Sequence, residues 1–127
     1  MRKYLLVFIP VIFVACSTCN IAKQTYIQEI QFGTGGGFTG AVTTYTLKSN
    51  GKLLRQSDVI SKAPCDSVNL FFELADQLPK EDFVRPGNTY SFVRVILRSG
   101  TYYYSWSIEE MPDEKVMDLY TKLHKLL

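Results

Sequence analysis

The sequence predicts an α+β domain in which a largely antiparallel five-stranded sheet packs with two helices, in the order β-β-β-α-β-β-α. Two segments repeat apolar residues at the i, i+3, i+4 spacing of an amphipathic helix. The segments before and between them are rich in threonine, tyrosine and valine and end at turn signals. Residues 25–127 are therefore expected to form one domain, with two helices packed on a sheet.

The first fifteen residues predict a secretory signal peptide. Arg2 and Lys3 form a positive start, residues 4–15 are largely apolar, and a small residue precedes Cys16. The apolar run is shorter than the ~20 residues that a membrane-spanning helix needs. The sequence Phe13-Val14-Ala15-Cys16 resembles the lipobox of bacterial lipoproteins, which implies cleavage before Cys16 and acylation of that cysteine, palmitate included.

This anchor sets the expected location. We expect the protein in the bacterial cell envelope, held by the lipid on Cys16 to the periplasmic side of the outer membrane, with residues 16–24 as a lipidated tether. An ordinary secreted protein cut nearby is the alternative, and the agreement of all three signal features favours the lipoprotein. Without residues 1–15 the chain has 12 basic and 12 acidic residues, so it lacks the positive excess typical of nucleic-acid binding.

Cys19 and Cys65 are the two remaining cysteines. An exported protein can hold a disulfide, and a bond between these two would pin the tether to the domain. Because connectivity cannot be read from sequence, we favour the alternative in which Cys65 is half-buried and Cys19 is free or separately modified.

The first half of the domain predicts three strands, at 25–32, 41–48 and 52–58. The glycine-rich segment 33–40 reads as a wide loop between the first two. Asn50-Gly51 is a strong signal for a two-residue hairpin turn. Such a turn places Leu47 opposite Leu54 on the apolar face.

The first helix is predicted between Pro64 and Pro79. Its apolar face consists of Val68, Phe71, Phe72, Ala75 and Leu78. The second helix is predicted at 112–127, with Pro112 in its first turn. Its apolar face consists of Val116, Leu119, Tyr120, Leu123, Leu126 and Leu127.

A polar loop at 80–88 separates the first helix from a second hairpin. Its strands are predicted at 89–98 and 101–108, joined by a turn at Ser99-Gly100. The pairs that share the core face are then Val93 with Trp106, Val95 with Tyr104, and Leu97 with Tyr102.

The residues provide no constellation for catalysis, metal or nucleotide binding. The one histidine, His124, is expected at the surface of the last helix, and no motif positions a nucleophile beside it. No metal-binding motif occurs, and no cofactor is expected. The segment 35–40 matches G-x-G-x-x-G, but a strand follows it, whereas a dinucleotide site needs a helix there. We therefore expect a protein that is not an enzyme.

Two surfaces are candidates for binding. The first is the loop that contains Gly35, Gly36, Gly37, Phe38, Thr39 and Gly40. Phe38 is either folded back into the core or presented to a partner, and fold-back is expected because a large exposed apolar side chain needs a reason. The second is the sheet face that carries Phe92, Arg94, Ile96 and Tyr103. That face either binds an acidic or apolar group or is a solvated sheet face.

Three segments resemble the emfourin-like proteins, small inhibitors of thermolysin-like metalloproteases of the protealysin type. They are Gly36-Gly37-Phe38-Thr39-Gly40, the hairpin from Thr89 to Ile108, and the terminal helix that begins at Met111-Pro112-Asp113-Glu114. The resemblance implies an inhibitor whose protein partner is a metalloprotease. Together with the predicted lipid anchor, it leads us to expect an envelope-tethered binding module, either a proteinaceous inhibitor or a ligand-binding domain, that uses the 33–40 loop. The alternative is a structural or assembly lipoprotein that uses the Phe92 face and inhibits nothing.

Overall fold

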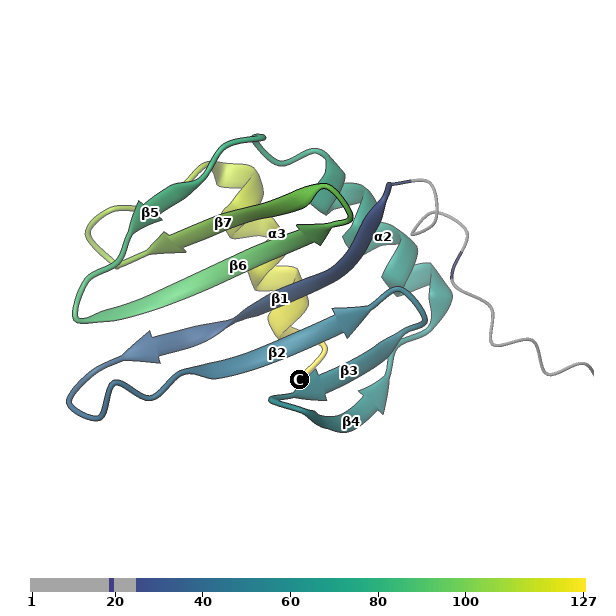
Figure 1. Cartoon of the computed structure of the whole chain (residues 1–127), viewed down its shortest axis with the longest axis horizontal. Coiled ribbons are helices and arrows are strands. Elements are labelled where there is room, and N and C mark those ends of the chain that lie inside the picture. The colour runs from purple at the N-terminus through teal and green to yellow at the C-terminus, as the bar shows by residue number, and fades with distance from the viewer. Residues whose placement is uncertain (1–18, 20–24) are drawn as a thin grey trace, which may run out of the picture.

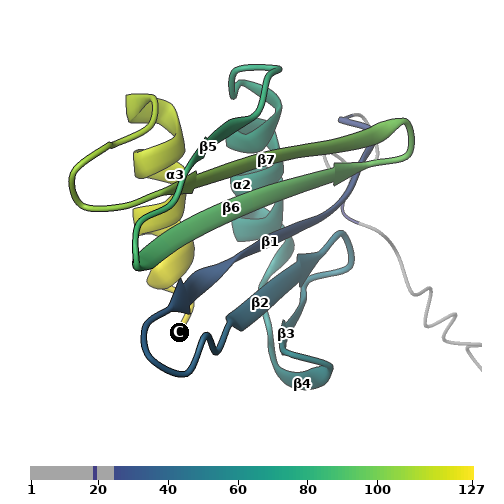
Figure 2. The ribbon, with the colours of Figure 1, turned by 60° about the vertical axis from the view of Figure 1, so that its left-hand side comes forward.

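The computed structural model describes Cys19 and residues 25–127, so the predicted signal peptide, Cys16 and the rest of the tether lie outside the described residues (Figure 1). The elements are β1 (Ile27–Gly36), β2 (Thr43–Lys48), β3 (Lys52–Arg55), β4 (Asp58–Lys62), α2 (Cys65–Asp76), β5 (Phe83–Arg85), β6 (Thr89–Leu97), β7 (Gly100–Trp106) and α3 (Glu114–His124). The strands of this described part form one sheet in the order β4-β3-β2-β1-β6-β7-β5. Both helices cover the same face of it, as the two ribbon views show (Figures 1 and 2).

The α+β class is confirmed, but the described sheet has seven strands instead of the predicted five. The predicted third strand breaks at Gln56, whose φ of 55° turns the chain back on itself to form β4. The other added strand, β5, lies within the predicted polar loop and pairs with β7 in parallel. All other neighbouring strands are antiparallel.

The register predicted for the β2–β3 hairpin is wrong by one residue. Leu47 lies opposite Leu53, and Thr46 lies opposite Leu54. The connection has three residues, and its last, Gly51, adopts a φ of 91° and donates its N–H to the Lys48 carbonyl. Because side chains alternate along a strand, a one-residue shift exchanges the two faces. Leu53 is therefore in the core, and Leu54 is on the outer face.

The register predicted for the β6–β7 hairpin is wrong by two residues. Its turn is at 98–99, so that Val93 lies opposite Tyr104 and Val95 opposite Tyr102. An even shift leaves each side chain on its predicted face. Tyr104 and Trp106 are accordingly buried in the core, as predicted.

The first strand extends four residues into the predicted glycine loop. Gly33 pairs with Phe92 and Gly35 with Tyr90 across β1 and β6. A Cβ atom on Gly35 would lie 2.6 Å from the Tyr90 ring, so the aromatic side chain occupies the space that the glycine leaves. The connecting loop is consequently residues 37–42 instead of 33–40.

Both helices have the predicted inner faces. In α2 these are Val68, Phe71, Phe72 and Ala75, and Leu78 is buried just beyond its end. In α3 the buried residues are Val116, Leu119 and Leu123. Asp113 caps α3 by accepting the backbone N–H of Lys115 at 2.9 Å. Leu127 was predicted to face inward but lies beyond the last helical turn and is exposed.

One core joins the sheet to the two helices. Its largest fully buried side chains include Ile30, Phe32, Leu47, Phe72, Leu119 and Leu123. The Tyr104 hydroxyl donates to the carbonyl of Pro79 just after α2, which ties that helix to β7. Burial is the main cause that raises the pKa of Tyr104 to about 12.

Cys19 and Cys65 form a disulfide, so our preference for a free Cys19 and a half-buried Cys65 is wrong. Their Cα atoms lie 5.4 Å apart, at the first residue of α2. Cys19 is only 2% exposed, belongs to the core cluster, and donates its N–H to the Ser49 carbonyl at 3.1 Å. The tether is thus attached to the domain at Cys19, well before the first strand.

Candidate binding site

The loop 37–42 projects from the sheet beyond the ends of β1 and β2 (Figure 1). Gly40 donates its N–H to the Gly37 carbonyl at 3.2 Å, which closes a tight turn with Phe38 and Thr39 in its centre. The relative exposure of Phe38 is 113%. The predicted fold-back of Phe38 into the core is therefore wrong, because the turn is too short to carry the ring back to the sheet.

Both ends of this loop are tied to the body of the domain. Gly37 donates its N–H to the Asn88 carbonyl at 2.7 Å, and the Gln56 side chain donates to the Val42 carbonyl at 2.9 Å. Gly36 has a φ of 90°, and a Cβ there would lie 2.0 Å from the Asn88 oxygen. Only glycine allows this close approach. These contacts hold both ends of the loop in place, so the position of the turn relative to the sheet is fixed.

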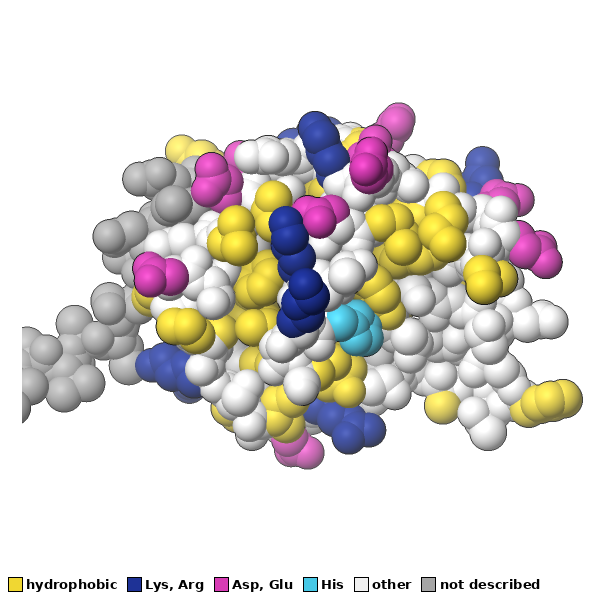
Figure 3. All heavy atoms as spheres, turned by 180° about the vertical axis from the view of Figure 1, so that it is seen from behind, with side chains coloured by type: hydrophobic (Ala, Val, Ile, Leu, Met, Phe, Trp, Pro, Cys, Tyr) yellow, Lys and Arg dark blue, Asp and Glu magenta, His cyan; other side chains and the backbone are white. Residues whose placement is uncertain are grey.

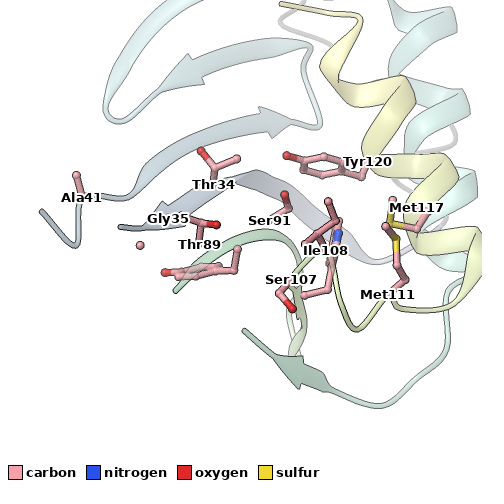
Figure 4. Close-up of a pocket in the computed structure, with 13 residues that line it drawn as sticks. Thr34, Gly35, Ala41, Thr89, Ser91, Ser107, Ile108, Met111, Met117 and Tyr120 are labelled. Atoms are coloured by element: carbon pink, nitrogen blue, oxygen red, sulfur yellow. The ribbon is translucent and has the colours of Figure 1, made fainter. Parts of the chain in front are cut away.

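A pocket of about 560 Å³ lies directly beside the loop, between the inner face of the sheet and α3 (Figure 4). Thr34 and Ser91 line it from the sheet, and Met117 and Tyr120 from the helix. The Tyr120 ring packs edge-on against Trp106, with the ring centres 5.0 Å apart. This volume is within the range of pockets that hold a small ligand or a side chain.

The rim of the pocket is apolar. Ile108 and Met111 are 88% and 55% exposed, and Val42 on the loop side is 41% exposed. The lining contains no charged side chain. We call the loop 37–42, the pocket and this rim the Phe38 end. It combines a projecting aromatic ring with an adjacent recess, an arrangement suited to contact with another macromolecule.

The second predicted surface lies on the opposite, helix-free face of the sheet. Its predicted members share that face, but Phe92 is only 2% exposed and not available for binding. Phe92 fills the space beside Gly33, and the Tyr90 and Tyr103 rings lie about 6 Å from it. Ile96, opposite Thr101, is half-buried.

Arg94 is engaged within this outer face. Its guanidinium lies 4.9 Å from the centre of the Tyr103 ring and donates to the Gln31 side chain at 2.8 Å. Gln31 donates in turn to Glu29 at 3.1 Å. These contacts satisfy the cation locally, so this surface resembles a self-contained sheet face more than an open anion site.

His124 is half-buried, whereas the sequence placed it at the surface. Its ring contacts Tyr120 and Phe32, with ring centres 4.4 and 5.7 Å away. Burial lowers the pKa of His124, although a helix C-terminus favours the protonated form. Among residues 19 and 25–127, no group of three or more His, Cys, Asp or Glu residues could hold a metal ion. None of the helices in these residues is long and apolar enough to cross a membrane.

No protein-family model matches this chain, and a search of curated proteins found no match either. The structure brings Gly36, Gly37, Phe38, Thr39 and Gly40 together at one tip and places Gly35 within β1. The pocket beside the tip was missed by sequence reasoning. Its walls come from five separate segments, at 34–36, 41, 89–91, 106–111 and 117–120. The signal that could have indicated it is the pair Met111 and Met117, two flexible apolar residues near the start of the last helix.

Proposed function

We propose that this chain is a lipid-anchored binding module of the bacterial envelope that engages a protein partner through the Phe38 end. The complete exposure of Phe38 on a tight, anchored turn is the observation that supports this most strongly. Burial of a phenylalanine contributes ~1.5–3 kcal/mol, which is not realised in the isolated domain. An aromatic side chain held in this way is typical of an interface anchor.

The pocket supports a two-part contact. Phe38 enters the partner, while an apolar side chain of the partner occupies the recess lined by Trp106, Met117 and Tyr120. Both parts lie on the same side of the domain, since Ala41 in the loop also lines the pocket. Because the turn is fixed at both of its ends, little conformational entropy is lost on binding.

A thermolysin-like metalloprotease is the partner that the emfourin resemblance suggests. Such enzymes have an apolar pocket for a residue beside the scissile bond, and Phe38 is a side chain of suitable chemistry. The hydrogen bond that closes the 37–40 turn holds the chain away from the extended form of a substrate. The loop is therefore expected to occupy the cleft without being cut.

Inhibition tests this proposal. The lipidated protein in detergent should inhibit a thermolysin-like protease of its own host, and Phe38→Ala should weaken binding by ~2 kcal/mol or more, which is about 30-fold in affinity. The melting temperature should stay unchanged, since Phe38 is fully exposed. Leu70→Ala, at an exposed apolar site on α2, is the matched control. Absence of inhibition by the unaltered protein removes the protease assignment.

The Cys19–Cys65 disulfide supports an exported location. Disulfides persist in oxidising compartments such as the periplasm and are rare in the cytosol. Cys16→Ala should abolish acylation, and the protein should leave the detergent phase or accumulate as the precursor. Mass spectrometry of the purified protein checks this, and a wild-type chain without acyl mass contradicts the lipid anchor.

A structural or assembly lipoprotein is the alternative. It would use the outer sheet face around Arg94 and Tyr103, and the internal contacts of Arg94 make that face the weaker candidate. Arg94→Ala together with Tyr103→Ala should leave partner binding intact under our proposal. The alternative would be favoured if that double variant lost an envelope complex while Phe38→Ala had no effect on it.

A further inference from the structure

The point where the tether joins the domain and the Phe38 end lie at opposite ends of the sheet. Cys19 is bound to the Ser49 carbonyl in the β2–β3 turn and to Cys65 at the start of α2. Loop 37–42 joins the other ends of β1 and β2. Both ribbon views place the described start of the chain and this loop far apart along the sheet (Figures 1 and 2). We call the region around Cys19 the anchor end.

The disulfide shortens the connection to the lipid. Three residue steps separate Cys16 from Cys19, a span of about 10 Å at most. Without the disulfide and the packing of Cys19, the connection would extend to Thr25, where the continuous described part begins. Thr25 is nine residue steps from Cys16, a span of about 30 Å. The ten residues of β1 separate its two ends by about 30 Å. The short connection therefore holds the anchor end within about 10 Å of the anchoring bilayer, whereas the Phe38 end lies about 30 Å further along the sheet.

The anchor end also carries a cluster of lysines. Lys48 ends β2, Lys52 begins β3, and Lys62 lies directly opposite Lys52 on β4. All three are exposed, and no ion pair within the described residues involves them. Like charges directly opposite each other destabilise a sheet. Anionic lipid headgroups next to the anchor would offset that repulsion.

The opposite end has a different charge character. The pocket lining is uncharged, and the loop between β7 and α3 beside it carries Glu109 and Glu110, of which Glu110 pairs with Arg85 at 3.4 Å. Its exposed apolar residues are Phe38, Ile108 and Met111, and their chemistry suits burial in a bilayer or in a protein. The short connection and the position of the lysines both favour a bilayer at the anchor end, which leaves the Phe38 end for a protein.

We propose that the Cys19–Cys65 disulfide and the three lysines make the domain stand on the bilayer by its anchor end, so that the Phe38 end faces away and meets a protein located off the membrane. This inference rests on the proposed acylation of Cys16. The apolar rim is then a protein-docking surface and not a membrane-insertion surface. Figure 3 shows the helix side of the molecule, where apolar side chains are interspersed with acidic and basic ones.

Energy transfer from tryptophan to an acceptor on lipid headgroups tests this orientation. The acylated protein is reconstituted into vesicles that contain anionic lipid, with Trp106→Phe removing the one native tryptophan. Ser99→Trp reports on the anchor end, in the exposed β6–β7 turn, and Phe38→Trp reports on the opposite end. Transfer should be several-fold higher from position 99. If Trp106→Phe does not fold by circular dichroism, native Trp106 serves as the donor near the Phe38 end.

Two variants test the cause of the orientation. A flexible Gly-Ser insertion of about ten residues between Cys16 and Cys19 lengthens the connection with the disulfide intact and should reduce the difference in transfer. Replacing Lys48, Lys52 and Lys62 by glutamate should reduce it further. Equal transfer from positions 38 and 99 in the unaltered background overturns the proposal and indicates membrane insertion of the Phe38 end. Failure to float with vesicles, with no acyl mass, is instead a failure of the lipid anchor.

Discussion

Replacement of both Cys19 and Cys65 by alanine is expected to lower the free energy of unfolding by about 4 kcal/mol. The bond closes a loop with a sequence separation of 46 residues. Constraining a loop of that length in the unfolded chain is worth ~4 kcal/mol at 25 °C by the chain-entropy relation. Alanine is used because Cys19 is buried, and serine would bury a hydroxyl there. The loss is a large part of the ~5–15 kcal/mol that stabilises a typical domain.

Urea unfolding, followed by the fluorescence of the buried Trp106, measures this effect on the acylated protein in detergent. The unaltered protein with a reductant is the matched comparison, and it should fall to the stability of the double variant. The double variant should not respond to the reductant. A loss below ~1 kcal/mol would refute the reasoning, since the loop would then be unconstrained by the bond or already ordered in the unfolded chain.

Four further substitutions test the core, the sheet, the loop 37–42 and the end of α3. Trp106→Ala should cost ~3–5 kcal/mol by thermal unfolding, as for other buried aromatics, and a cost under ~1 kcal/mol would mean that the ring is dispensable to the core. Gly33→Ala should cost ~1–3 kcal/mol or more, because its Cβ would lie 1.9 Å from the Thr43 carbonyl oxygen. Gly40→Ala, which has open space, should cost only the ~1–2 kcal/mol of its left-handed φ, and a larger cost than at Gly33 would contradict this. Burial lowers the pKa of His124 below its ordinary value of 6.5, so the unfolded chain takes up the proton first, and stability present above pH 6.5 declines as the pH falls below it. His124→Gln should flatten that decline in urea titrations at several pH values, and an unchanged profile would show that another group is responsible.

The helices could be predicted from sequence because their burial follows a regular spacing. Val68, Phe71 and Phe72 face the core in α2 as expected. The edge strands β4 and β5 could not be predicted, for a different reason in each case. All five residues of β4 are exposed, so no alternation marks it, and β5 has only three residues that pair with a strand about twenty positions later.

Hairpin registers depended on turn length, which the sequence did not define uniquely. Asn50-Gly51 matched a two-residue turn, but the left-handed residue Gly51 closes a three-residue one. The disulfide was likewise undetermined, because nothing in the spacing of Cys19 and Cys65 shows that the tether folds back onto the start of α2.

The sequence predicted the position of the candidate site correctly, but not the direction of Phe38 or the pocket beside it. The glycines of 36–40 identified the tip, but whether Phe38 points inward or outward depends on a turn that only the backbone geometry reveals. The pocket beside it combines Thr34, Ser91 and Tyr120, residues that no local pattern connects. Similarly, Phe92 looked like a surface residue because the cross-strand glycine that shelters it lies almost sixty positions earlier.

In-cell photo-crosslinking tests most directly whether the Phe38 end is the surface that binds a partner. A photoreactive phenylalanine analogue is placed at Phe38 and, in separate variants, at Tyr103 on the outer sheet face and at Leu70 on α2. We expect a discrete protein adduct from position 38 that disappears when Met111→Ala and Ile108→Ala disrupt the rim of the pocket, with no adduct from the other two positions. An adduct from position 103 with none from position 38 would contradict the account and assign partner binding to the outer face of the sheet.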